Sequence, residues 1–563
     1  MDSVWHVLPE DPQRAQTLAR ALEIDPITAQ LLINRGLTDA APARNFLHPT
    51  WESLGDPAEL PDMARAVARL RQAIAKREAV LVFGDSDVDG LTANVILYEV
   101  LRELGAIVRS RQSNRIADGY GLPERFIEAL RRSTTTLLIL VDCGTNQADA
   151  IRRLASHGID TIIVDHHVPI GECARPLALI NPHRDPSAAH HGLSSAGLAF
   201  KVVQALCDGD AQERLEGFLD LAALGTLADC SPLVGENRTI VALGLERIVR
   251  SARRGLRRLC EATRTDEPDV EQVIHRLVPR LNASGRLGDP AAVWHLLLDG
   301  DGEPIDGWLE QAEAAHATTR HLHRQLIGEA QEQVNRLHFK DQYVLIVSRS
   351  GWPQGLMGSL ASQLTQRYGR PSIALALDAH QGNGSGRSIP LFNLLEALKS
   401  CQELLVRFGG HAQACGLTLD RKHLEPFQLL LNQQAERSMG REGLRKTRTI
   451  DVERPLAAVG GRWVEEGEQL APFGQGNPRP SVVIRGLTLE VKSPRMAIAS
   501  DGVTRVMARG PFTALASGAQ YDVVASPGMS EGACVLTVSE LRTSGVQSGP
   551  GQPSGMRYTR EFA

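Results

Sequence analysis

Aromatic residues are scarce in this sequence, and their scarcity limits how the protein can bind a ligand by stacking. Phe, Trp and Tyr together make up 4% of the 563 residues. Any platform on which bases stack must therefore be small. The net charge of −5 likewise excludes a uniformly basic coat. A focused basic patch would still suffice for phosphate contacts.

The sequence also lacks a disulfide framework and long apolar runs. Its eight cysteines form no C-x-x-C pair and show no regular spacing, which is typical of reduced thiols. The first residues have neither the basic flank nor the apolar core of a signal peptide. No run of about eighteen apolar residues occurs, so we expect no membrane-spanning segment and a cytoplasmic protein.

The length is too great for one hydrophobic core, and about three or four domains are expected. We predict an α/β protein with a parallel-sheet domain, a long connecting helix, a second smaller α/β domain and a C-terminal β-barrel of the oligonucleotide-binding type. The predicted boundaries are 1–60 for a helical lead-in, 61–300 for the first domain, 301–339 for the helix, 340–445 for the second domain, 446–543 for the barrel and 544–563 for a disordered tail.

Three acids follow the first strong strand signal, the apolar run at 80–83. Asp85, Asp87 and Asp89 occupy alternate positions before Gly90. Alternate residues of an extended segment point the same way, so at least two of these acids converge. Clustered carboxylates stay ionised only around a cation. The alternative interpretation is a capped turn with solvated acids.

The next two buried strand signals also end in metal-type ligands. One is followed by Asp142, and the other by Asp165, His166 and His167. Strands separated by helical stretches pair in parallel, so all three deliver their side chains to one edge of one sheet. Ligands of α/β proteins bind at that edge. The convergence favours a metal site over a capped turn. Asp229 ends a small-residue helix and either closes the site or caps the helix.

Several segments are candidates for contact with phosphate. The basic stretch at 250–264 is either a solvated face or a phosphate-binding surface. The segment 279–286 carries two arginines among small residues in a predicted loop, which suits a phosphate-facing wall. The stretch at 382–388 is predicted to be a glycine-rich loop that cradles phosphate. A second glycine-containing loop holds Gly409, Gly410 and His411.

Four of these motifs occur in one order: the acids at 85–90, Asp165-His166-His167, the arginines at 280–286 and Gly409-Gly410-His411. With them the chain resembles the DHH phosphoesterase superfamily, and within it the exonucleases of single-stranded DNA. The likeness runs from about residue 55 to 540. It implies a metal-dependent nuclease that removes nucleotides from the 5′ end of single-stranded DNA in repair and recombination.

The resemblance also implies roles for individual residues. One or two Mn²⁺ or Mg²⁺ ions would be held by Asp87, Asp89, Asp142, His166 and Asp229. Catalysis would depend on Asp87, Asp142 and His167, with Asp85 and Asp165 behind the ligands and Asp165 orienting His166. Substrate would be bound by Arg115, Arg280, Asn282, Arg286, Ser385, Arg387, Gly409, Gly410 and His411, with Arg115, Ser385 and Arg387 forming the 5′-phosphate pocket. Possible protein partners are a single-strand-binding protein and a helicase, and a monomer is expected.

The ligand chemistry supports the same choice of ion. Carboxylates with one imidazole favour Mg²⁺ and Mn²⁺ over zinc, and Asp142 on a central strand could bridge two ions. The chain departs from the family at Trp352-Pro353, where Trp-His is usual, so a contact by that histidine is not carried over. Phe473 is a candidate stacking residue or a core residue. The rival functions are a phosphodiesterase of short oligonucleotides or cyclic dinucleotides, a binding protein without activity, and an aspartyl-phosphate phosphatase.

Overall fold

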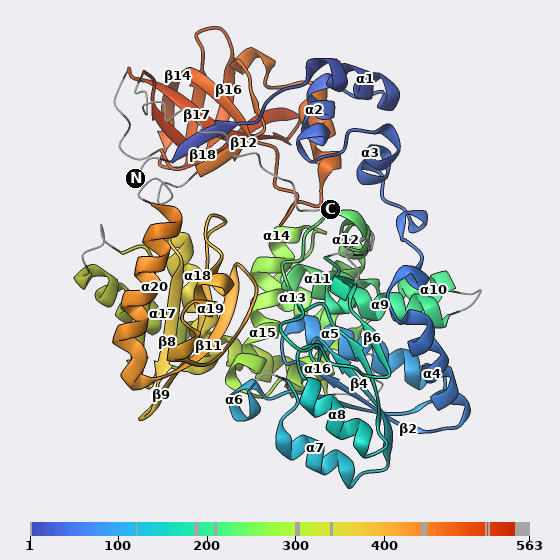
Figure 1. Cartoon of the computed structure of the whole chain (residues 1–563). Helices are drawn as coiled ribbons and strands as arrows, with labels where there is room; N and C mark the ends of the chain where they lie inside the picture. The colour runs from blue at the N-terminus through green and yellow to red at the C-terminus, as the bar shows by residue number, and fades with distance from the viewer. Residues whose placement is uncertain are drawn as a thin grey trace. The chain divides into compact units, whose positions relative to one another are not determined.

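The computed structural model describes residues 3–119, 121–184, 190, 192–207, 211–298, 304–337, 342–440, 447–512, 515 and 518–545. The chain forms two compact units (Figure 1). Unit 1 combines Met1–Ser53, Pro232–Ala242 and Arg445–Ala563, and unit 2 combines Leu54–Ser231 and Leu243–Leu444. Most of the predicted tail lies outside the described residues.

Unit 2 begins with the predicted parallel sheet, which is confirmed. Its strands have the order β3 (Ile107–Gln112), β2 (Ala79–Gly84), β4 (Thr135–Val141), β5 (Asp160–Val164) and β6 (Ala178–Ile180). All neighbours pair in parallel. The central strands are almost wholly apolar and buried, as expected for a sheet covered on both faces.

Helices surround this sheet. On one side, α7 (Glu124–Arg131) and α8 (Ala148–Ser156) pack their apolar residues against β2, β4 and β5. Elsewhere α5 (Val88–Glu103) packs against α9 (Ser195–Leu206) and α11 (Leu219–Ala228). Other helices of this region are α4 (Met63–Ala75), α6 (Arg115–Asp118), α10 (Ala211–Glu216), α13 (Arg254–Thr263), α14 (Val270–Gln272), α15 (Val278–Leu287) and α16 (Ala291–Leu297). Helix α12 (Gly235–Val249) begins in the residues of unit 1 and ends in those of unit 2.

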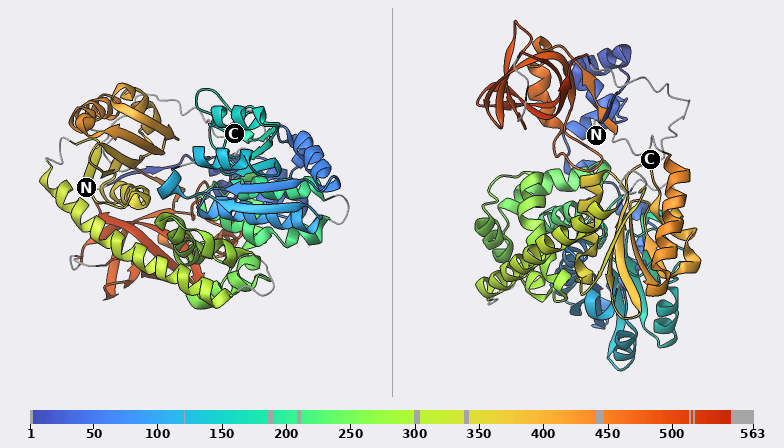
Figure 2. Two further views of the ribbon diagram at one scale, coloured as in Figure 1. Left: turned by 90° about the horizontal axis from the view of Figure 1, so that it is seen from below. Right: turned by 90° about the vertical axis from the view of Figure 1, so that its left-hand side faces the viewer.

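The predicted connecting helix and second α/β domain are also present. Helix α17 (Ile305–Arg336) is a single long helix, and its C-terminal half packs on a second sheet (Figure 2). That sheet has the order β10 (Leu405–Gly410), β11 (Ala414–Asp420), β9 (Gln381–Arg387), β8 (Ser372–Leu377) and β7 (Leu345–Ser350). One face packs on α19 (Leu394–Lys399) and α20 (Leu424–Met439). The other packs on α17 and α18 (Met357–Tyr368).

Two predicted loops are regular elements instead. The glycine-rich stretch at 382–388 forms strand β9 up to Arg387, because glycine permits a very close approach of strands. A Cβ on Gly384 would lie 2.0 Å from the carbonyl oxygen of Ala374. The segment at 279–286 lies in helix α15, whose first turn tolerates the proline. Its Gly285 packs against the backbone of Ser86, where a Cβ would lie 2.2 Å from the carbonyl oxygen.

The C-terminal barrel of unit 1 is confirmed. Strands β14 (Val482–Ser493), β15 (Met496–Ser500), β16 (Arg505–Arg509), β18 (Ala533–Thr543) and β17 (Gln520–Ser530) pair in this order, and β14 pairs with β17 to close the barrel. Strand β14 is long and irregular. The irregularity between Ile484 and Leu487, with Gly486 at φ +68°, interrupts its apolar pattern.

The N-terminal segment packs into the core of the same unit. Helices α1 (Pro12–Leu22), α2 (Pro26–Asn34) and α3 (Ala40–Leu47) contribute buried residues to a cluster shared with the barrel and with α21 (Arg462–Gly467). Strand β1 (Val4–Val7) pairs in parallel with β12 (Thr447–Ile450), and β13 (Val452–Glu453) pairs with β14. Across the described ranges, no helix combines the length and apolar character needed to cross a membrane.

Candidate metal centre and anion site

The acids that follow β2 are held in three different ways. Asp85 is fully buried and accepts hydrogen bonds from the Ser86 amide at 2.7 Å and the Ser113 hydroxyl at 2.6 Å. Asp87 caps helix α5, because its Oδ1 accepts from the Gly90 amide at 3.1 Å. Asp89 lies in the first turn of α5 and is also buried. The strand-to-helix junction therefore fixes all three carboxylates.

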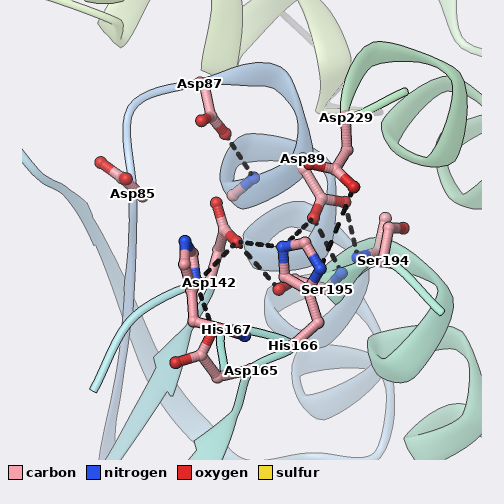
Figure 3. A network of polar contacts seen from close by, with 12 residues as sticks. Asp85, Asp87, Asp89, Asp142, Asp165, His166, His167, Ser194, Ser195 and Asp229 are labelled. Atoms are coloured by element: carbon pink, nitrogen blue, oxygen red, sulfur yellow. Dashed lines mark hydrogen bonds and ion pairs between the residues drawn. The ribbon is translucent and has the colours of Figure 1, made fainter. Parts of the chain in front are cut away.

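His166 lies among acids from three other segments (Figure 3). Its Nε2 is 3.4 Å from Oδ1 of Asp142 and 3.8 Å from Oδ2 of Asp89. Its Nδ1 is 3.9 Å from Oδ2 of Asp229. Three groups of possible ligands result, each within 4.8 Å: Asp142, His166 and His167; Asp89, His166 and Asp229; and Asp85, Asp87 and Asp142. All five predicted metal ligands thus belong to neighbouring, overlapping groups.

The electrostatics of this cluster favour a bound cation. Burial and the nearby Asp229 raise the pKa of Asp89 to about 7. Burial and Asp87 hold the pKa of Asp142 well above its usual range. A divalent cation between these carboxylates would favour their ionised forms and displace their protons to solvent. All donors in the three groups are carboxylate oxygens or imidazole nitrogens, and this set fits Mg²⁺ or Mn²⁺.

Asp165 orients His167, whereas the resemblance predicted His166. Its Oδ1 lies 2.7 Å from Nδ1 of His167, and its Oδ2 accepts from the Thr145 amide at 3.1 Å. Burial lowers the pKa of His167, but Asp165 outweighs it and raises that pKa to about 9. The bond to Asp165 leaves Nε2 of His167 as the nitrogen that can face a ligand.

His411 reaches the same place from the second sheet. It follows β10, and its ring stacks on that of His167 with centroids 5.8 Å apart and planes inclined by 25°. Burial and the two neighbouring histidines, His167 and His166, lower the pKa of His411 to about 4. His411 is therefore neutral at pH 7 beside a protonated His167. Gly409 and Gly410, predicted to lie in a loop, end strand β10 instead. A Cβ on Gly409 would lie 3.9 Å from Cδ1 of Ile170, so the end of β10 also approaches the first domain.

Three arginines gather beside Asp87. Arg115 donates through Nε to both oxygens of Asp85 at 2.9 Å and through Nη2 to Asp87 at 2.8 Å. Burial lowers the pKa of Arg286, and Arg115 and Arg387 lower it further. Among the described residues, no carboxylate forms an ion pair with Arg286 or Arg387. Like charges held together in this way make a binding site for an anion.

The other predicted substrate residues fall into two groups. Some lie beside the arginines, and the others make contacts between helices. Ser385 and Arg387 lie on the same strand and face Gly358, where a Cβ would lie 3.7 Å from Oγ and 3.2 Å from Nη2. Arg280 does not join the cluster, because it pairs with Glu313 at 2.6 Å. Asn282 accepts a hydrogen bond from the Val88 amide at 3.1 Å. Arg280 and Asn282 therefore hold helices in this structure.

Comparison with known proteins identifies the family. The model of the DHH family, N-terminal domain, matches residues 79–226, and that of the DHHA1 domain matches residues 341–437. The single-stranded-DNA-specific exonuclease RecJ of Thermus thermophilus is 32% identical over 87% of this chain and 70% of its own length. The chain belongs to the RecJ family. RecJ of Bacillus subtilis is 34% identical over 86% of this chain, and the chain spans 62% of its length.

Solved RecJ structures have the same fold. The crystal structure of Thermus thermophilus RecJ in complex with Mn²⁺ matches with a TM-score of 0.82 at 27% identity. The match covers 96% of this chain and 79% of that one. The structure of the same protein in complex with Mg²⁺ matches with a TM-score of 0.75 at 25% identity, covering 96% and 78%. The predicted membership in the DHH superfamily is confirmed.

In this RecJ-family chain the start of helix α9 also contacts the acids, a contact that was not predicted from the sequence. Ser195 and Ala196 donate their backbone amides to Asp89, both at 2.8 Å. The Ser195 hydroxyl donates to Oδ1 of Asp142 at 3.0 Å. Serines before an apolar helical run are a capping signal, so Ser194 and Ser195 could have been identified as a helix start. Nothing in that signal indicated contact with the acids.

Proposed function

We propose that this chain is a metal-dependent exonuclease that hydrolyses phosphodiester bonds of single-stranded DNA from the 5′ end. The observation that carries the proposal is that two clusters of opposite charge lie side by side. An acid and histidine cluster that fits divalent cations lies directly beside three clustered arginines that fit an anion. A phosphate group held by the arginines would therefore lie close to the metal ligands. The RecJ relatives are named for this activity.

The proposed ion is Mn²⁺ or Mg²⁺, both of which are present in crystal structures of Thermus thermophilus RecJ. One or two ions would be held by Asp87, Asp89, Asp142, His166 and Asp229. Asp142 belongs to two of the three ligand groups, which supports its proposed bridging role. Such ions supply an activated water and offset charge on the phosphate.

The remaining residues position the substrate and move its protons. His167, protonated through its bond to Asp165, donates from Nε2 to an oxygen of the scissile phosphate. His411 stacks on His167 and binds substrate as a neutral imidazole. Arg115, Arg286, Arg387 and Ser385 form the pocket for the terminal 5′ phosphate, and Arg115 exchanges some of its contacts with Asp85 and Asp87 for that phosphate.

The barrel would give the proposed enzyme a second binding surface for unpaired DNA. Phe473 is a stacking candidate on unit 1, although the guanidinium of Arg479 already covers one face of its ring at 4.7 Å from the centroid. We further propose a monomer that acts in the cytoplasm. Its substrate would be supplied by a helicase and covered by a single-strand-binding protein.

The proposal is tested with end-labelled DNA and purified protein. Single-stranded, double-stranded and dinucleotide substrates are incubated with Mn²⁺, Mg²⁺ or EDTA. We expect mononucleotides from the 5′ end of the single strand only, and no product with EDTA. Preferred cleavage of dinucleotides would instead identify a phosphodiesterase of short oligonucleotides. Cleavage that ignores EDTA would overturn the metal-dependent mechanism.

A further inference from the structure

The first turn of helix α9 contacts two acids of the proposed metal site, and these acids come from different segments. Asp89 lies in the first turn of α5, and Asp142 directly follows β4. The backbone amide of Ser195 donates to Oδ2 of Asp89 at 2.8 Å, and its hydroxyl donates to Oδ1 of Asp142 at 3.0 Å. The amide of Ala196 donates to the other oxygen of Asp89 at 2.8 Å. One residue therefore joins both carboxylates.

These contacts are well enclosed. Ser195 is fully buried, and Asp89 and Asp142 are each 3% exposed. The approach of α9 to α5 and α11 leaves no spare room, because a Cβ on Gly225 would lie 2.4 Å from both the Ala196 Cβ and the Thr92 Oγ1. Water cannot readily replace a lost hydroxyl in such a site, so the carboxylate would lose this hydrogen bond without a substitute.

We propose that Ser195 is a positioning residue that sets the geometry and metal affinity of the proposed site. With a cation bound, Asp142 is ionised and only accepts hydrogen bonds, so the Ser195 hydroxyl donates to it. That bond fixes the rotation of the carboxylate and occupies a lone pair of Oδ1. Donors behind metal ligands commonly change metal affinity by about 10–100-fold.

The inference rests on the proposed metal site and is tested by Mn²⁺ binding to metal-free protein, measured by calorimetry and by electron paramagnetic resonance. Ser195→Ala removes the hydroxyl and keeps both backbone amides. We expect Mn²⁺ binding weaker by about tenfold and an altered resonance spectrum, because the ligand geometry changes. Ser195→Gly provides a second variant without the hydroxyl, in which the same weakening is expected.

Ser251→Ala is the matched control. The Ser251 hydroxyl also donates to a buried carboxylate, Oδ2 of Asp220 at 2.6 Å, away from the metal ligands. We expect a lower melting temperature and unchanged Mn²⁺ affinity in this variant. Equal Mn²⁺ affinity of Ser195→Ala and the parent chain would overturn the inference alone, as would equal weakening in Ser251→Ala. A parent chain that binds no Mn²⁺ would overturn the proposed function as well.

Discussion

The acidic edge of the first sheet and the arginine cluster beside it are built in opposite ways. The acids follow β2, β4 and β5 directly and are fixed by the backbone around them. The arginines come from α6, α15 and β9, which lie far apart in the chain. A metal ion requires ligands held close together, whereas a phosphate can be bound by long side chains that reach it from several elements. Four predictions test this difference.

Substitution of a shared acid should have the largest effect. Asp142→Ala removes a carboxylate that belongs to two ligand groups. We expect hydrolysis of single-stranded DNA to fall by about a thousandfold or more, equivalent to about 4 kcal/mol of lost transition-state stabilisation. DNA affinity should persist because the arginines remain. Turnover is measured with end-labelled DNA and binding by fluorescence anisotropy. Near-normal turnover would rule out the bridging role of Asp142.

Loss of one arginine should have a smaller and more selective effect. Arg387→Ala should reduce kcat/KM on 5′-phosphorylated DNA by about 10–100-fold, as expected for a charged hydrogen bond of about 1.5–3 kcal/mol. DNA with a 5′ hydroxyl should be affected far less. Arg280→Ala is the control, since Arg280 pairs with Glu313 and should show no such preference. An equal loss on both substrates would place Arg387 outside the phosphate pocket.

Metal binding should become tighter as pH rises. In the metal-free protein the pKa of Asp89 is raised to about 7, and that of His166 is held well above its usual value by Asp229 and Asp142 against the effect of burial. Raised pKa values stabilise the metal-free fold at low pH, and this stabilisation is lost as pH rises through them. Mn²⁺ displaces these protons. Its effect on the melting temperature should therefore be larger at about pH 8 than at about pH 6. The opposite order, measured by calorimetric scans, would contradict this account.

The basic stretch at 250–264 should have the smallest effect. Arg253 is buried between Glu99 and Asp220, and Arg258 pairs with Glu261 and Asp306. These acidic partners argue against phosphate binding by Arg253 and Arg258. We expect the double substitution of Arg250 and Arg258 by alanine to change DNA affinity by less than about twofold, with an unchanged salt dependence. A weaker dependence of DNA affinity on salt concentration in this variant would instead show that the stretch contacts DNA.

The sequence predicted the acidic edge far better than the arginine cluster, and the reason is local. Asp142 and Asp165 directly follow apolar runs that can only be buried strands, so their placement follows from sheet topology. The predicted partner of Asp165, His166, was wrong. Which of the two histidines faces Asp165 depends on how the side chains rotate after the strand, and the structure pairs Asp165 with His167. Arg387 and Arg280 were both predicted to bind substrate. Only tertiary packing gives Arg280 an acidic partner and leaves Arg387 beside other cations.

The errors in the fold also have physical causes. Glycines at 382–386 usually indicate a loop, but strand pairing at this distance excludes any side chain at Gly384. The same reasoning applies to Gly285, which lies inside a helix at a close contact with Ser86. Contacts that depend on missing side chains leave no positive signal in one sequence. Ser195 was missed for a related reason, since its amide and hydroxyl act on acids distant in the chain.

The shared core of unit 1 has a consequence for biosynthesis. Leu31 and Leu32 of α2 are fully buried in a cluster completed by barrel residues such as Val482 and Leu536. The ribosome makes the first partners long before the last, and emerging chains order their early segments first where they can. The apolar faces of the N-terminal helices therefore stay exposed until the barrel strands have been translated. In a growing cell, this interval is when the nascent chain most needs protection by a chaperone.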